Sequence, residues 1–167
     1  MEESVKAALG FVEAYREKLG IGRMDPAMYS PLALAYIGDG VYEIMIRAKV
    51  LSRGNMQVNK MHKKSTSLVK AQTQAHMIRL LEPELTDEEL AVFKRGRNAK
   101  SVTAAKNATI IDYRMATGLE ALVGYLYLSE RFERLAELIS YGLEKIGETE
   151  RRHECGKFTE RGQERGA

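Results

Sequence analysis

The chain has 167 residues, 44% of them hydrophobic and 29% charged, and its 26 basic and 23 acidic residues leave a net charge of +3. This composition is ordinary for a globular protein and excludes collagen-like, low-complexity and disulfide-rich classes. The single cysteine, Cys155, excludes a disulfide within the chain, and no apolar run reaches the length of a membrane span. Since the first residues do not resemble a signal peptide either, we expect a cytoplasmic protein.

Only three prolines interrupt a chain rich in strong helix formers, which predicts an all-α fold. The apolar periodicity predicts helices over about residues 1–19, 31–51, 56–81 (as one helix or two), 86–94, 113–129 and 130–146. The helices at 31–51 and 113–129 are apolar almost all round, so we expect both to be central and buried. The expected organisation is an N-terminal helical extension (1–24), one folded domain (25–146) and a disordered polar tail (147–167).

Basic residues are concentrated in two windows, 44–81 and 90–111, that contain no acidic residue. Together the windows hold half of the 26 basic residues. One interpretation is a pair of solvated faces balanced by acids elsewhere in the fold. The other is a surface that binds the phosphates of a polyanion, as nucleic-acid binding without sequence readout requires.

Two acids interrupt the apolar helix at 31–51. Asp39 and Glu43 lie four residues apart and therefore share one face. An ionised carboxylate in apolar surroundings is unfavourable unless it is paired, hydrogen-bonded or bound to metal. Gly38 and Gly40 flank Asp39 and weaken the helix, which indicates that another group approaches the backbone closely. A structural acid paired with a lysine or arginine explains Asp39 equally well.

The second apolar helix repeats this pattern. Glu120 is the only charge between residues 117 and 128, and Gly124 one turn later allows another helix to pack closely. We therefore expect Asp39 and Glu120 to meet. Like charges held together need a cation, and hard oxygen ligands select Mg²⁺ or Mn²⁺. Such a site activates water and stabilises charge on a reacting phosphate, so beside the basic windows the expected substrate is a nucleic-acid backbone.

These residues also resemble a known family. Residues 37–41 (IGDGV) resemble the signature of ribonuclease III, and residues 119–128 resemble its second acidic helix. The closer resemblance is to Mini-ribonuclease III, the reduced form of the family without a double-stranded-RNA-binding domain. It spans about residues 25–145 and includes 32–43, a basic loop at 95–101, and Tyr113, Arg114 and Thr117 ahead of Glu120.

The resemblance implies a ribonuclease III domain that works as a homodimer, each subunit cutting one strand of an RNA duplex with Mg²⁺ or, in its place, Mn²⁺. It implies that Asp39 and Glu120 are the catalytic, metal-linked acids, and that the work is maturation of the large-subunit (23S) ribosomal RNA precursor. Full ribonuclease III proteins have acids where Ala35 and Thr117 stand here. Mini-ribonuclease III shares this reduced set, so only two acids are carried over.

We expect the catalytic domain to hold the RNA itself, because the residues after 146 are too few and too polar for a binding domain. A-form duplexes are recognised mainly through phosphates and 2′-hydroxyls, which suits basic and polar side chains. The expected RNA-binding residues are Arg95, Arg97, Asn98, Lys100 and Ser101, with help from Lys63, Lys64, Lys106 and Arg114.

Glu43 is either a further acid of the site or the partner of Arg47, one turn along the helix. His62 and His76 have no cysteine or histidine partner at ligand spacing, which argues against zinc. We expect the tyrosines of the two apolar helices, Tyr36, Tyr42, Tyr125 and Tyr127, to lie in the core or in a dimer interface.

Two other functions fit part of this pattern. The first is a non-catalytic double-stranded-RNA-binding protein on the same fold, which would be free to lose Asp39 and Glu120. The second is a helical adaptor for acidic protein partners, which would account for the basic windows and leave the buried acids unexplained.

Overall fold

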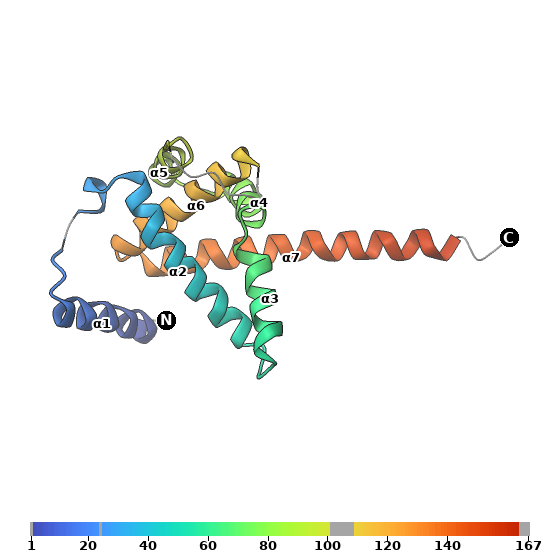
Figure 1. Ribbon diagram of the computed structural model, residues 1–167, viewed down its shortest axis with the longest axis horizontal. Coiled ribbons are helices and arrows are strands. Elements are labelled where there is room, and N and C mark those ends of the chain that lie inside the picture. Colours follow the sequence, from blue (N-terminus) through green and yellow to red (C-terminus); the bar gives the residue numbers. More distant parts are fainter. Residues whose placement is uncertain (1, 24, 101–108, 164–167) are drawn as a thin grey trace.

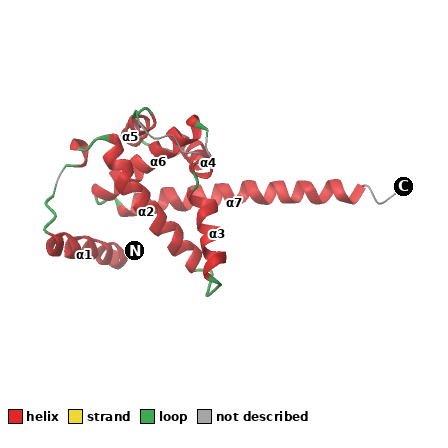
Figure 2. Ribbon diagram, viewed as in Figure 1, coloured by secondary structure: helices red, strands yellow, loops and turns green. Residues whose placement is uncertain are grey.

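The computed structural model describes residues 2–23, 25–100 and 109–163. Every regular element in this part of the chain is helical, so the predicted all-α class is confirmed (Figure 2). In chain order the elements are α1 (Glu2–Leu19), the short 3₁₀ helix η1 (Pro26–Met28), α2 (Pro31–Leu51), α3 (Val58–Val69), α4 (Ala71–Leu81), the 3₁₀ helix η2 (Glu82–Glu84), α5 (Asp87–Arg97), α6 (Ile110–Leu128) and α7 (Phe132–Gln163).

Side-chain caps fix the starts of the helices that matter for function. Ser30 caps α2, where its hydroxyl oxygen accepts a hydrogen bond from the backbone N–H of Ala33 at 3.1 Å. Thr86 and Glu89 form the predicted capping box of α5. Thr109 caps α6, accepting from the N–H of Asp112. The chain therefore specifies locally where α2, α5 and α6 begin.

Helix α6 lies at the centre of the fold, packed against α2, α4 and α5 (Figure 1). Its Leu119, Leu122 and Leu126 are each at most 1% exposed. Fully burying one such side chain contributes about 2 kcal/mol to folding. The main core extends from α6 to side chains of α2, α4 and α7. The expectation that the second apolar helix is central is confirmed.

Helix α2 is buried on one face only, so the expectation that it too is central is wrong. Its inner face includes Tyr42 and Ile46, which are inaccessible to solvent. Its outer face carries a row of residues spaced one turn apart, which we call the α2 stripe: Leu32, Tyr36, Gly40 and Ile44. Tyr36 is 85% and Ile44 67% exposed. A helix that is apolar all round is predicted to be buried, but its sequence does not say whether its own chain or another packs against each face.

Two helices run further than predicted. Helix α5 continues to Arg97, because Gly96 has no side chain and packs directly on α6. A Cβ at Gly96 would lie 3.0 Å from the Cα of Gly118. The sequence predicts a disordered tail over 147–167, whereas α7 continues as a helix to Gln163 and leaves the body of the molecule (Figure 1). No proline interrupts this stretch, and its Glu, Lys and Arg residues favour helix.

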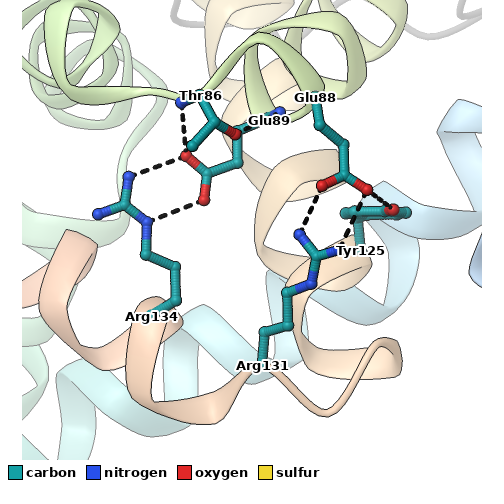
Figure 3. A network of polar contacts seen from close by, with 6 residues as sticks. All are labelled: Thr86, Glu88, Glu89, Tyr125, Arg131 and Arg134. Atoms are coloured by element: carbon teal, nitrogen blue, oxygen red, sulfur yellow. Dashed lines mark hydrogen bonds and ion pairs between the residues drawn. The ribbon is translucent and has the colours of Figure 1, made fainter.

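Charged side chains fasten the start of α5 to the turn between α6 and α7 (Figure 3). Arg134 donates to both oxygens of Glu89, from Nε at 2.8 Å and from Nη2 at 2.9 Å. The carboxylate of Glu89 is buried, with 2% of the residue exposed. Beside this pair, exposed Glu88 accepts hydrogen bonds from Arg131 and from the hydroxyl of Tyr125. The two pairs hold the N-terminal end of α5 in place, while its basic last turn lies at the other end.

Helix α1 is attached to the same turn. Arg16 donates to the carboxylate of Glu130 at 2.7 Å, and the hydroxyls of Tyr15 and Tyr127 are hydrogen-bonded. Glu130 has a φ of 58°, the conformation that turns the chain from α6 into α7. In the part of the chain that the structure describes, no helix combines the length and apolar character needed to cross a bilayer.

Candidate active site

Helices α2 and α6 meet backbone to backbone at their glycines. A Cβ at Gly38 would lie 1.8 Å from the carbonyl oxygen of Glu120, and one at Gly124 would lie 2.0 Å from that of Leu34. No side chain fits at either position. The expectation that Gly124 admits a second helix at close range is confirmed. Gly40, in contrast, has nothing within 4 Å of its Cβ position among the described residues, so the expectation of a close approach is not met there by this part of the chain.

This crossing brings the two predicted acids to one pocket of about 510 Å³. Asp39 reaches it from α2 and Glu120 from α6. Asp39 is exposed, whereas Glu120 is largely buried. We call this site the acidic pocket, and its remaining lining residues are Leu32, Ala35, Tyr36, Ile37, Gly40, Tyr113 and Thr117. The expectation that the two acids come together is met by the fold.

The acidic pocket disfavours negative charge on the carboxyl groups that line it. Burial raises the pKa of Glu120 to about 7, and the charge of Asp39 adds to this effect, while a hydrogen bond from Gln74 opposes it. Partial desolvation at the edge of the pocket, and then the charge of Glu43, raise the pKa of Asp39. Neighbouring acids whose ionised forms are both disfavoured are stabilised by a cation between them.

The donors at the pocket fit a divalent cation. Asp39 and Glu120 offer carboxylate oxygens, which Mg²⁺ and Mn²⁺ prefer. Next to Glu120, the Oε1 atom of Gln74 is buried and has no hydrogen-bond partner among the described residues. Within the described ranges, no three acids, histidines or cysteines cluster as ligands. A cation held by two carboxylates keeps most of its coordination sites for water and substrate, as Mg²⁺ usually does.

Glu43 does not line the acidic pocket. Its carboxylate accepts a hydrogen bond from Arg47 at 2.7 Å on the solvent side of α2. This is the helical ion pair that was one of the two roles expected for it. Glu43 still acts on the site from a distance, because its charge contributes to the raised pKa of Asp39.

Residues 95–97 are helical, which corrects the expected basic loop over this part. Arg95 and Arg97 form the last turn of α5, and Asn98 caps its end. Arg95 donates to the carbonyl oxygen of Tyr29 at 3.5 Å, and the Arg97 guanidinium lies 5.6 Å from the ring centre of Phe93. A Cβ at Gly96, between the two arginines, would lie 3.1 Å from the carbonyl oxygen of Thr117, a residue of the acidic pocket. The basic end of α5 therefore adjoins the pocket.

The other residues expected to bind RNA are spread over three elements. Lys63 and Lys64 are exposed on α3, Lys100 follows α5, and Arg114 is exposed on α6 beside Tyr113. Ser101 and Lys106 lie outside the described residues. The predicted set is therefore a discontinuous surface and not one loop.

Gln74 is the residue of this site that the sequence reasoning missed. It lies on α4 and is 2% exposed. Its position was a readable signal: it occupies the apolar face of α4 one turn before Ile78 and two turns before Leu81. A polar residue at a core position needs a partner, which should have marked it for attention beside Asp39 and Glu120.

Comparison with known proteins agrees with this geometry. The model of the ribonuclease III domain matches residues 32–131, which contain both acids. The chain is thus a ribonuclease III-type endoribonuclease. The chain is 53% identical to Mini-ribonuclease 3 of Clostridium tetani over 118 residues, 70% of this chain and 78% of that protein. It is 50% identical to Mini-ribonuclease 3 of Enterococcus faecalis over 120 residues, 71% of this chain and 91% of that one. The chain belongs to the Mini-ribonuclease 3 family.

A solved structure shares the architecture. An X-ray structure of a protein from Fusobacterium nucleatum is 28% identical to the chain and aligns with a TM-score of 0.65. The alignment covers 71% of this chain and 95% of the Fusobacterium protein. The helical body described above is therefore an arrangement that crystallography has also found.

Proposed function

We propose that this endoribonuclease cuts double-stranded RNA as a homodimer with Mg²⁺, or Mn²⁺ in its place, and matures the 23S ribosomal RNA precursor in the cytoplasm. The observation that carries the proposal is that Asp39 and Glu120, from two helices, line one pocket of a ribonuclease III-type domain. The raised pKa of each acid supports a role that requires a cation.

Asp39 and Glu120 would hold the divalent ion, which when bound generates a nucleophilic water and stabilises charge on the reacting phosphate. Exposed Asp39 can be reached by a phosphate from solvent, while buried Glu120 is fixed by the helix crossing beneath it. Thr117, where full ribonuclease III proteins have an acid, brings no carboxylate, and its hydroxyl donates to the carbonyl oxygen of Tyr113 at 3.0 Å. Two acids of fixed position are the preorganised ligands that such a reaction needs.

The α2 stripe supports the homodimer. Tyr36 and Ile44 are exposed apolar side chains in the middle of the domain, and Gly40 between them has room at its Cβ position for a neighbouring helix. Three stripe residues, Leu32, Tyr36 and Gly40, also line the acidic pocket. A second copy packed on the stripe would therefore border the pocket, and the dimer would present one site for each strand of a duplex.

The basic end of α5 supports a grip on the RNA backbone. Arg95 and Arg97 adjoin the acidic pocket through the contact of Gly96 with α6. Lys63 and Lys64 are exposed on α3, and Arg114 lies on the pocket helix α6. Phosphate contacts of this kind position a duplex without reading its bases.

The test is incubation of the purified protein with a long RNA duplex and with a 23S precursor transcript, in Mg²⁺, in Mn²⁺ and in EDTA. We expect both strands to be cut with either ion and neither in EDTA. Asp39→Asn and Glu120→Gln keep side-chain shape and should abolish cleavage while still shifting the duplex in a gel. Equal cleavage in EDTA, or by either variant, would contradict the metal assignment. Cleavage of the duplex but not of the precursor would contradict only the substrate assignment.

A further inference from the structure

Gln74 is a buried polar side chain whose hydrogen bonds are incomplete. In the part of the chain that the structure describes, the buried polar or charged residues are Gln74, Glu89 and Thr117. Glu89 is paired with Arg134, and Thr117 donates to its own helix. Gln74 alone among these three keeps a side-chain atom, Oε1, without a partner. Buried polar atoms are nearly always hydrogen-bonded, so this exception needs an explanation.

The orientation of the amide is determined by its neighbours. Nε2 lies 2.9 Å from the carbonyl oxygen of Val69 and 3.3 Å from Oε1 of Glu120. Both neighbours are acceptors, so the NH₂ group must face them and the amide cannot be turned round. Gln74 Oε1 therefore still needs a donor, and it belongs to the same amide group that contacts the carboxylate of Glu120.

The carbonyl oxygen of Val69 anchors this side chain. Val69 is the last residue of α3, and the hydroxyl of Thr73 also reaches back to α3, donating to the carbonyl oxygen of Ser67 at 2.7 Å. The first turn of α4 is thereby fixed to the end of α3. Glu120 is held by a donor that is itself tied to the main chain.

We propose that Gln74 is a positioning residue of the metal site, holding the carboxylate of Glu120 through Nε2 and accepting a hydrogen bond through Oε1 from a water molecule on the bound divalent cation. The inference rests on the proposed metal-dependent function. The surroundings favour this donor: the charged side chains that line the pocket, Asp39 and Glu120, are both acidic and attract a cation, and a water on that cation is a strong donor. Partners of this kind orient the ligands of a metal and set its affinity.

The test measures binding of Mn²⁺ to the RNA-free protein by electron paramagnetic resonance of the free ion. Gln74→Met keeps the length of the side chain and removes both its donor and its acceptor. We expect about tenfold weaker Mn²⁺ binding, the usual loss for a partner of a metal ligand. Cleavage measured against Mn²⁺ concentration should need correspondingly more metal. Gln72→Met is the matched control, since Gln72 is exposed on the same helix, and it should bind Mn²⁺ like the wild type.

A second variant separates the two functions of the amide. Gln74→Glu keeps an acceptor toward the cation and loses the donor toward Val69 and Glu120. We expect it to unfold at lower temperature in EDTA and to bind Mn²⁺ at least as tightly as the wild type. Thermal melts in EDTA show which variants are folded.

Several outcomes would overturn the inference. One is a folded Gln74→Met that binds Mn²⁺ as tightly as the wild type, even if its melting temperature falls, since Gln74 would then be only structural. A folded Gln74→Glu with tenfold weaker binding would remove the acceptor role. If the wild-type protein itself binds no Mn²⁺ and cleaves RNA without metal, the proposed function fails first.

Discussion

Gly38 packs against the main chain of Glu120, with only 1.8 Å between that carbonyl oxygen and the position a Cβ would take. Replacing Gly38 by alanine must push α2 away from α6 and separate the two acids. We expect Gly38→Ala to cost about 3 kcal/mol, the upper end for overpacking because the obstacle is backbone. The melting temperature should fall by about 10 °C, with loss of cleavage.

Gly10→Ala is the control for this prediction, because it makes the same change in helix α1, away from the α2 stripe and the acidic pocket. Its Cβ meets nothing within 4 Å among the described residues, and alanine favours helix over glycine by about 1 kcal/mol. We expect its melting temperature to be equal to or above that of the wild type. Equal losses in both variants would mean that the close contact at Gly38 has no special role.

The Glu89–Arg134 pair should stabilise the fold except in acid. Hydrogen bonds from Arg134 hold the pKa of Glu89 below its usual value of 4.5. A lowered pKa gives stability that is present above the unfolded pKa and is lost as the pH falls through the folded one. Arg134→Met leaves a buried carboxylate unpaired and should cost about 3 kcal/mol at pH 7, measured by urea unfolding, and less near pH 3.

The neighbouring exposed pair, Glu88 and Arg131, provides the control for that measurement. Arg131→Met removes the partner of Glu88 at the same turn, and both side chains of this pair are more than 40% exposed. Exposed pairs contribute less than about 1 kcal/mol. If Arg131→Met destabilises the protein as much as Arg134→Met does, burial is not what makes the Glu89 pair strong.

Glu120→Gln should stabilise the metal-free protein at alkaline pH. The folded pKa of about 7 lies above the usual value of 4.5 for this carboxyl group, so folding favours the protonated acid. The contribution of this group to folding stability is fully present below about pH 4.5 and is lost as the pH rises through about 7. Glutamine removes the charge and should raise the melting temperature in EDTA by several degrees at pH 8, and by less at pH 5.5. A larger gain at pH 5.5 than at pH 8 would reverse the sign and contradict the pKa.

Alanine at both Arg95 and Arg97 should weaken duplex binding without regard to sequence. Each lost phosphate contact releases one counterion fewer, so the dependence of affinity on salt should flatten by up to about one unit per contact. Filter binding over a range of salt concentrations measures this. The single-turnover rate at saturating RNA should change much less, because Asp39 and Glu120 are untouched. Normal binding with a slow rate would instead make these arginines part of the reaction.

Ile44→Asp should convert the proposed dimer to a monomer. Ile44 belongs to the α2 stripe, is 67% exposed and does not line the acidic pocket, so one subunit should fold normally. Sedimentation without RNA should show the 18.8 kDa chain alone, against twice that mass for the wild type. Val58→Asp, at a residue 59% exposed and off the stripe, should leave the dimer intact. A wild type that sediments as a monomer would refute the proposed assembly.

The sequence was most informative where local chemistry decides the structure. The capping box at Thr86 and Glu89 forms as predicted because both halves lie within four residues. The meeting of Asp39 and Glu120 was also predictable, since each is an isolated acid beside a glycine in an apolar helix. Neither inference required knowledge of distant contacts.

The misses concern contacts between elements. Gly96 reads as a helix end in the sequence, yet it continues α5 because α6 lies against it. The exposed face of α2 could not be distinguished from a buried one, because an apolar face has the same hydropathy whether it packs against its own chain or against another. Gln74 was overlooked because its partner Glu120 is 46 residues away.

The main-chain contact between α2 and α6 also bears on how freely this enzyme can be altered. Since Gly38 and Gly124 let the two backbones touch, the spacing of Asp39 and Glu120 does not depend on which apolar side chains fill the rest of the core. Leucines, isoleucines and valines away from the crossing can be exchanged for others of similar volume with little shift of the acids. A laboratory that wants a heat-resistant reagent for cutting RNA duplexes can therefore redesign most of the interior, provided that these two glycines are retained.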